Sequence, residues 1–450
     1  MQRSLRYCCG VSSVTDARHD LRRQPVAGRD GVWLQDSSTN LMVINAVFTT
    51  DRLDRETFRD LWAERVMRAG GGRRFDRFTR RIVFVGRRAY WQEDPDFDLD
   101  RHVVLAPPLE GDPLALSTRR ALQDYVGRLA SEPLPWDRPL WQFQIVPEYR
   151  DGMSAVYCRI HHVMADGMAL VPLLFSLMDP DPEVGRPGPL VAKVSGFEKV
   201  VAAALAGPFL LAQKFLWRPD RSPVHGSPLA GRKRVGWTDP IPVEVIKAVK
   251  NAAGATLNDV LMACVSAAFD RYVTARTGAP LKQLRVSMPV NVRPLGEEPR
   301  MENKFAAVML DLPVGFADIR ERVAATKRRL DAVKRSPEPL FTYGTVRLLL
   351  GTLPAAVSRL LIDYLANKCT CVISNVPGPW WPIYLGGRRM RAMMFWVPQR
   401  ADIGIGVSIL SLSGELMVGV ICDVELVAEP QELMEGFSAE FERLKASLGL

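Results

Sequence analysis

The sequence has no apolar run long enough to cross a lipid bilayer. The longest run, VVAAALAGPFLLA at residues 200–212, has 13 residues, whereas a spanning helix needs about 20. Phe215, Trp217 and several arginines follow it, and aromatic side chains beside basic ones are typical of the interface of anionic membranes. The run is therefore predicted to form either a buried helix that links two domains or a segment that lies on a membrane surface.

Paired cysteines and glycine-rich loops are also lacking. The seven cysteines are odd in number and scattered through apolar stretches, and no CxxC pair lies near a second one. We therefore expect reduced cysteines, with neither a disulfide framework nor a structural zinc site. The sequence contains no phosphate-binding glycine loop, which argues against a nucleotide hydrolase or a dinucleotide-dependent enzyme.

Positive charge exceeds negative charge in the chain. The 59 Lys and Arg residues against 50 Asp and Glu give a formal net charge of +9 and a pI near 9.3. Such a balance favours an anionic partner, which includes a membrane surface, a substrate that carries a nucleotide, and nucleic acid. Because the basic residues are dispersed and no base-reading or stacking module is present, we expect no nucleic-acid partner.

The 450 residues are predicted to form an α+β protein with two lobes. Residues 1–26 are polar, lack the apolar core of a signal peptide, and are predicted to be a disordered extension. We expect the first lobe at 27–180, a connection rich in proline and glycine with one apolar helix at 181–240, and the second lobe at 241–450. Hydrophobic periodicity predicts, among other elements, a strand at 155–160, a helix with Thr256 as its N-cap, strands at 284–292 and 306–314, a helix at 317–334, a hairpin around Ser413–Gly414 and a C-terminal helix.

Two of only five histidines, His161 and His162, are adjacent in the segment IHHVMADGM. An imidazole with a pKa of about 6.5 can take a proton from a hydroxyl or thiol at neutral pH. Asp166 is expected to hold the turn through backbone bonds or an arginine, and Gly167 to adopt a backbone conformation that bulkier residues resist. A metal site is disfavoured because adjacent histidines on a strand point to opposite faces. The alternative is a histidine-containing turn with a structural role only.

The motif HHVMADG at residues 161–167 is similar to the signature of the coenzyme A-dependent acyltransferase superfamily, which includes chloramphenicol acetyltransferase and peptide-synthetase condensation domains. Further segments resemble the bifunctional wax ester synthase/diacylglycerol acyltransferase family and follow in its order over about residues 27–448. They are DGVWLQD (30–36), PLW (139–141), TLNDV (256–260), MPVNVRP (288–294) and SNVPGP (374–379).

The resemblance implies two lobes like chloramphenicol acetyltransferase subunits, with the active site in a tunnel between them. It implies that His162 is the general base, which deprotonates the hydroxyl of a fatty alcohol or diacylglycerol as it attacks a long-chain acyl-coenzyme A thioester. His161 would support it, and Asp166 would be structural, with Arg293 as the expected partner. Acyl-coenzyme A is then a co-substrate and no further cofactor is expected. We expect a cytoplasmic protein in peripheral contact with a membrane or lipid droplet.

The remaining matched residues have less specific roles. Two roles stay open for Asn258, a hydrogen bond near the reacting carbonyl or a bond to the first turn of its helix. We expect the crossover between the lobes to be shaped by Ser374, Asn375, Pro377 and Gly378. An acyltransferase for another hydroxyl or amine acceptor, and a non-catalytic lipid-binding protein, remain alternatives. Three positions depart from the family pattern and leave substrate preference open: Glu302 before Asn303, Asp36 in place of glutamate, and Pro147–Glu148 without the usual glycine.

Overall fold

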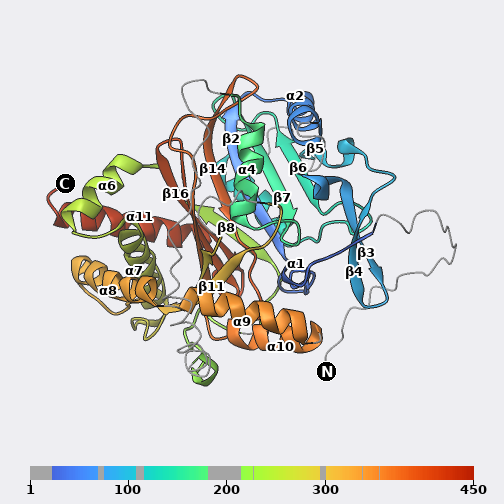
Figure 1. Cartoon of the computed structure of the whole chain (residues 1–450). Helices are drawn as coiled ribbons and strands as arrows, with labels where there is room; N and C mark the ends of the chain where they lie inside the picture. Colours follow the sequence, from blue (N-terminus) through green and yellow to red (C-terminus); the bar gives the residue numbers. More distant parts are fainter. Residues whose placement is uncertain are drawn as a thin grey trace.

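The computed structural model describes residues 23–68, 75–107, 116–180, 214–226, 228–293, 300–336, 338–353 and 355–450. Two large β-sheets with helices packed on them form the body of the molecule (Figure 1). The predicted 200–212 helix lies outside the described residues. The fold is α+β, as the sequence predicted.

The first large sheet has six strands in the order β13-β14-β2-β7-β6-β5. Its centre is the antiparallel pair β2–β7, in which Val43 lies opposite His161. The longer helices described in this half are α2 (Arg55–Trp62), which continues as a π-helical turn to Arg68, α3 (Arg119–Ala130) and α4 (Gly167–Leu177). The strands are β2 (Val43–Asp51), β5 (Val103–Leu105), β6 (Trp141–Val146), β7 (Met153–His161), β13 (Tyr384–Leu385) and β14 (Arg388–Trp396).

The second large sheet has the order β11-β10-β12-β15-β16-β8, and β9 pairs with β16 as well. Its strands are β8 (Lys233–Trp237), β9 (Ile241–Pro242), β10 (Arg285–Asn291), β11 (Phe305–Asp311), β12 (Cys371–Pro377), β15 (Ile405–Leu412) and β16 (Glu415–Asp423). The helices of this half are α6 (Val243–Ala252), α7 (Leu257–Thr277), α8 (Ile319–Arg335), α9 (Glu338–Thr352), α10 (Ala355–Ala366) and α11 (Pro430–Ser447). Figure 1 shows α7, α8 and α11 together on one side of this sheet and α9–α10 beside its β11 edge.

A small third sheet corrects one expectation for the N-terminal region. Gln24–Pro25 form β1, which pairs with β4 (Arg88–Glu93), and β4 pairs in turn with β3 (Arg80–Val85). The segment predicted to be disordered, residues 1–26, therefore includes an ordered strand at Gln24–Pro25. Residues 1–22 lie outside the described part. Three short helical turns complete the region: α1 (Gly28–Gly31), η4 (Asp76–Thr79) and η5 (Leu99–Arg101).

Local sequence explains where the longest helix begins and ends. The Thr256 side chain accepts a hydrogen bond from the backbone of Asp259, and the Asp259 carboxylate accepts one from the backbone of Thr256. This reciprocal capping box satisfies backbone N–H groups that have no partner within the helix. At the other end Gly278 has a φ of 72°, the left-handed conformation that glycine adopts without a steric penalty. The expected helix start at Thr256 is confirmed.

Two strands cross between the halves of the chain. β14 lies in the C-terminal half of the sequence but pairs with β2 of the first sheet, and β8 lies in the predicted connection but pairs with β16 of the second. As a result, residues of β8, β14 and β16 contribute to the hydrophobic core of the first half. The predicted lobes at 27–180 and 241–450 therefore do not coincide with the two sheets, because each sheet contains a strand from outside its lobe. That these ranges are separate folding units stays a prediction.

The described helices include no single one that is both long and apolar enough to span a membrane. Helices α6 and α7 pass that test only as a pair, and they meet at 92°. Most of α7 is buried in the core of the second half. The five cysteines within the described residues are all free, and burial raises the pKa of the Cys369 thiol to about 12.

Candidate active site

The paired histidines lie where β7 ends, and the backbone of the second one is held from two sides. The His162 N–H donates to the carbonyl oxygen of Met42 at 2.7 Å, just before β2. Its own carbonyl oxygen accepts a hydrogen bond from Nδ2 of Asn303 at 2.9 Å. The turn is thus fixed between a segment of the first half and one of the second.

The His162 imidazole is enclosed by aromatic rings. The Trp33 ring stacks on it with centroids 3.8 Å apart and an angle of 19° between the planes, and Phe305 of β11 lies 6.0 Å away. Burial lowers the pKa of His162 to about 4, although the negative charge of Asp166 opposes this shift. The Nδ1 atom is buried and has no hydrogen-bond partner among the described residues. The ring is therefore neutral at pH 7.

His161 has a different environment, because its ring is tied into the turn. The Val163 N–H donates to Nδ1 of His161 at 3.2 Å. Since Nδ1 accepts, Nε2 is the nitrogen that donates, and it faces Oδ1 of Asp36 at 3.3 Å. The same Oδ1 accepts a hydrogen bond from the Met42 N–H. Asp36 thereby orients His161 and the segment that holds His162.

Asp166 connects the turn to the second half of the chain. Its Oδ1 caps α4 by accepting a hydrogen bond from Ala169 N–H, and its Oδ2 accepts one from Lys304 N–H. Nη2 of Arg293 donates to Oδ2 at 2.9 Å, so the expected Asp166–Arg293 ion pair is present. Arg293 is 1% exposed and also donates to the Glu302 carbonyl oxygen. The pair joins the histidine turn to the loop before β11.

A second buried network around the turn was not foreseen from the sequence. Asp30, which is fully buried, accepts hydrogen bonds from both nitrogens of Asn303 and forms an ion pair with Arg77. Arg77 also donates to the carbonyl oxygen of Met164, two residues after His162. Glu302, where the family has glycine, pairs with Arg29 at 2.5 Å. The only sequence signals for this network were the segments DGVWLQD and Glu302-Asn303.

The matched residues of α7 and β12 meet each other. Nδ2 of Asn375 donates to Oδ1 of Asn258 at 2.6 Å. The Asn258 Nδ2 group makes no hydrogen bond within the described residues, so its role in substrate binding stays a prediction. Ser374 is buried one residue before Asn375.

Only one of the two glycines of the site, Gly378, is required to be small. A Cβ on Gly167 would lie 3.6 Å from the Val376 side chain, an ordinary contact, and its φ is not positive. The expected unusual backbone at Gly167 is therefore wrong. Gly378, directly after Pro377, donates its N–H to Ser411, and a Cβ there would lie 2.5 Å from the Ser411 carbonyl oxygen. Close approach of two chain segments requires glycine at 378.

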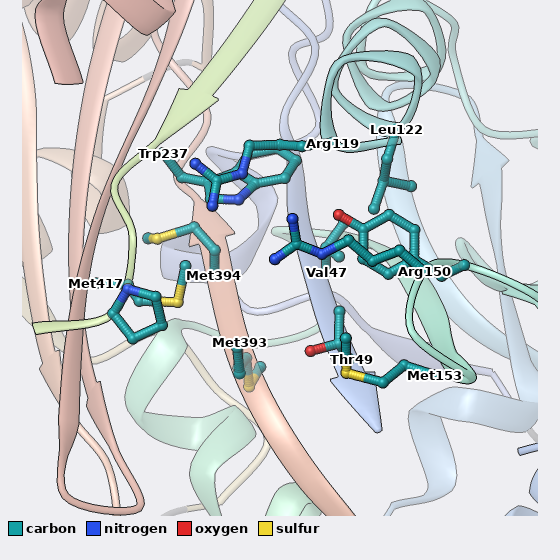
Figure 2. Close-up of a pocket in the computed structure, with 13 residues that line it drawn as sticks. Val47, Thr49, Arg119, Leu122, Arg150, Met153, Trp237, Met393, Met394 and Met417 are labelled. Atoms are coloured by element: carbon teal, nitrogen blue, oxygen red, sulfur yellow. The ribbon is translucent and has the colours of Figure 1, made fainter. Parts of the chain in front are cut away.

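Two hollows lie between segments that are far apart in the sequence. One, of about 500 Å³, is lined largely by apolar side chains, and the side chains of Arg119 and Arg150 extend over it (Figure 2). The other, of about 820 Å³, is polar and has walls from residues 35–42, α10 and residues 400–402. His162 lines neither hollow, so the tunnel between the lobes stays a prediction. Within the described residues no group of three or more His, Cys, Asp or Glu side chains is arranged to hold a metal.

Comparison with known families identifies the family of the chain. The catalytic domain of wax ester synthase/diacylglycerol acyltransferase matches residues 32–203, and the WS/DGAT C-terminal domain matches residues 301–445. The first match contains the paired histidines and the second contains Asn303. The chain belongs to the wax ester synthase/diacylglycerol acyltransferase family.

Relatives in this family are distant in sequence. The chain is 26% identical over 386 residues to a probable diacylglycerol O-acyltransferase of Mycobacterium tuberculosis, which covers 79% of this chain and 81% of the relative. It is 26% identical over 387 residues to wax ester synthase/diacylglycerol acyltransferase 2 of Arabidopsis thaliana, covering 75% of this chain and 78% of that protein.

Solved structures share the two-lobed fold. The wax ester synthase/diacylglycerol acyltransferase from Marinobacter aquaeolei VT8 superposes with a TM-score of 0.68 at 20% identity, covering 95% of this chain and all of that one. The trichothecene 15-O-acetyltransferase of Fusarium sporotrichioides has a TM-score of 0.61 at 12% identity, covering 94% and 95%. The expected two-lobed architecture is confirmed, and the chain is an acyltransferase of this family.

The burial of His162 predicts the pH dependence of this family member. Because the pKa of His162 is lowered to about 4, a reaction that uses this imidazole as its base would be inactivated by protonation only below that value. We expect kcat/KM to stay constant from about pH 8 to about pH 5 and to fall as the pH drops further, since kcat/KM follows the ionisation of the free enzyme. Initial rates in a mixed buffer, with folding checked by circular dichroism, measure this. An acid limb near the ordinary value of about 6.5 would contradict the enclosed imidazole.

The stacked Trp33 predicts a second effect on the same curve. Trp33→Ala admits water to the His162 ring, so the acid limb should move upward toward about pH 6.5. The loss of orientation should lower the rate by about 10- to 100-fold. Trp33→Phe keeps an aromatic face and serves as the matched control, with most activity retained. An alanine variant with unchanged rate and unchanged acid limb would show that the stack does not position the base.

Proposed function

We propose that this protein transfers a long-chain acyl group from acyl-coenzyme A to the hydroxyl of a fatty alcohol or a diacylglycerol, with His162 as the general base. The observation that carries the proposal is the state of that side chain. It is a neutral imidazole, enclosed by aromatic rings, with a buried and unpartnered Nδ1 and a backbone held on both sides. A general base must have a free lone pair and a fixed position.

The proposed reaction follows from acyl-transfer chemistry. His162 takes the proton of the acceptor hydroxyl while the oxygen attacks the thioester carbonyl. The tetrahedral oxyanion then collapses, the C–S bond breaks, and the imidazolium returns the proton to the coenzyme A thiolate. The negative charge of Asp166 stabilises the imidazolium that forms between these steps.

Neighbouring residues support the base in this proposal. His161, oriented by Asp36, keeps the turn in place, and the Asp166–Arg293 pair ties it to the second half. Asn258, whose oxygen is held by Asn375, is left with an N–H group that can donate to the reacting carbonyl. The excess of Lys and Arg suits a substrate with several phosphates.

The acceptor is tested by thiol release. Purified protein is incubated with palmitoyl-coenzyme A and either hexadecanol or dipalmitoylglycerol, beside a His162→Ala control. Release that needs both an acceptor and His162 supports the proposal, and the better acceptor distinguishes wax ester from triacylglycerol formation. Relatives carry names for both activities. Absence of release with either acceptor would refute this substrate assignment and favour another hydroxyl or amine acceptor or a lipid-binding role.

We also propose that the protein works in the cytoplasm at the surface of a membrane or lipid droplet. The proposed acceptors are insoluble in water and reside in such surfaces. The net charge of +9 favours anionic lipid headgroups. Fractionation of cells that express the tagged protein, with and without high salt, tests this location.

A further inference from the structure

Exposed apolar side chains are concentrated on one part of the surface. Twelve large hydrophobic residues in the described part of the chain are exposed. Five of them lie on α9, on α10 or in the short segment that contacts α10, and they are Leu216, Leu348, Val357, Leu360 and Tyr364. Leu216 is 82% exposed and Leu360 is 69% exposed. Contiguous apolar surface of this kind marks a site of contact with another molecule or a membrane.

Four of the five side chains are neighbours for structural reasons, and the fifth lies on the adjoining helix. On α10, Val357, Leu360 and Tyr364 are spaced i, i+3 and i+7, so they form one stripe along the helix. The Tyr364 hydroxyl donates to the Phe215 carbonyl oxygen at 2.8 Å, and the two rings stack 5.6 Å apart. Leu216 is therefore next to the stripe. Leu348 lies on α9, which packs against α10 and β11. We call these five residues the α9–α10 face.

We propose that the α9–α10 face inserts into the headgroup region of an anionic lipid surface. An amphipathic helix that buries one apolar stripe in the interface and keeps cations at its edge binds anionic bilayers. Arg218 and Arg221 are exposed within five residues of Leu216, and Arg359 is exposed between two residues of the stripe. Asp363, the nearby carboxylate, pairs with Arg400 at 2.7 Å and with Arg359 at 3.5 Å. These two arginines and one carboxylate leave a single excess positive charge, to which Arg218 and Arg221 add.

The position of the face suits the proposed reaction. Arg359 and Asp363 of α10 form one wall of the 820 Å³ polar hollow, and Met42 forms another. The Met42 carbonyl oxygen binds the His162 N–H. A lipid surface on α10 would therefore lie beside a polar hollow whose wall includes Met42, the residue that binds the His162 backbone, although His162 itself does not line the hollow. The purpose of the contact rests on the proposed acyl transfer, but the binding itself does not.

The experiment is flotation of the full chain with vesicles. One set is pure phosphatidylcholine, and the other contains about 30% phosphatidylglycerol. The test variant is Leu216→Glu with Leu360→Glu. The matched control is Phe84→Glu with Leu105→Glu, which changes two equally large, exposed residues of β3 and β5 by the same charge. We expect the natural protein to bind the anionic vesicles, the test variant to bind about tenfold more weakly, and the control to bind within about twofold of the natural protein.

Four results would overturn the proposal. Equal vesicle binding by the test variant and the natural protein would exclude the face, and loss of binding only in the control would assign the contact to β3 and β5. A melting temperature that falls strongly in the test variant would show that residues 200–212 or another segment of the chain covers the face. A natural protein that fails to bind vesicles and is a dimer, with a monomeric test variant, would assign the face to a second copy.

Turnover separates this proposal from the proposed function. With hexanoyl-coenzyme A and hexanol, which need no lipid surface, the test variant should match the natural protein. With diacylglycerol in anionic vesicles its rate should fall about tenfold. Vesicle binding without any turnover would refute the reaction and leave the contact standing, whereas turnover on vesicle-borne diacylglycerol that is unchanged in the test variant would refute the contact.

Discussion

Replacing His162 by alanine is expected to lower the acyl-transfer rate by about 10²–10⁴-fold, the usual contribution of a positioned general base. Its Nδ1 has no hydrogen bond to lose, so the loss of stability should come from the cavity left by the buried ring and from the lost ring contacts with Trp33 and Phe305, of which the ring contacts account for about 1 kcal/mol. Thiol release under saturating substrate and urea unfolding measure the two quantities. Retention of most activity would refute the assignment of the base.

His161→Ala is the matched control for this variant. Its ring accepts the Val163 N–H and contacts Asp36, so its removal should destabilise the turn. We expect a larger loss of stability and a smaller loss of rate than for His162→Ala. The reverse pattern, with full turnover in His162→Ala and none in His161→Ala, would exchange the two roles.

Arg293→Met is expected to lower the free energy of unfolding by about 3–5 kcal/mol, because it leaves the buried Asp166 carboxylate without its charged partner. Removal of one partner of a buried pair is costly, while removal of both is cheaper. Arg293→Met with Asp166→Asn should therefore be more stable than Arg293→Met. Urea unfolding followed by tryptophan fluorescence measures all three proteins.

A surface pair provides the reference for this prediction. Arg52 and Glu148 lie 3.6 Å apart with both side chains largely exposed. Arg52→Met should change the unfolding free energy by less than about 1 kcal/mol, because water screens an exposed ion pair. If Arg293→Met and Arg52→Met unfolded at the same urea concentration, the Asp166–Arg293 pair would not join the two halves of the site.

Elements with local signals were predictable from the sequence. The helix that begins after Thr256 has a capping box within four residues, and the β15–β16 hairpin turns at Ser413–Gly414, where both φ angles are positive. The strand predicted at 155–160 is most of β7. Capping, turn geometry and hydrophobic periodicity act over a few residues, so they can be read without knowledge of the fold.

Strand partners were not predictable in the same way. β14 contains RRMRAMMFW, and its neighbour β2 is more than 300 residues away in the chain. Helix α9 has apolar residues on several sides, and α10 directs an apolar stripe to the surface. Such elements lack the simple contrast between a buried and a solvated face on which sequence interpretation depends.

In the site, too, residues close together in the sequence were predictable and contacts between distant segments were not. His161, His162 and Asp166 lie within six residues of each other, and Arg293 was inferred from the matched segment MPVNVRP. Asp30 and Asn303, by contrast, meet across more than 270 residues. Each lies in a segment singled out in the sequence, but neither segment indicates that the two residues are in contact. The low pKa of His162 also depends on tertiary structure, because it results from burial beneath Trp33 and beside Phe305.

The sequence by itself determined the family, most of the regular elements and the candidates for the reactive residues, because these follow from contiguous motifs and local periodicity. Only the tertiary structure decided how the imidazole is buried and which distant residues hold it. Tertiary structure also decided that β14 and β8 pair with strands of the other half, and that α10 has an apolar stripe on its exposed side. The physical reason is that desolvation and buried hydrogen bonds depend on which segments meet, and this depends on the packing of the whole chain.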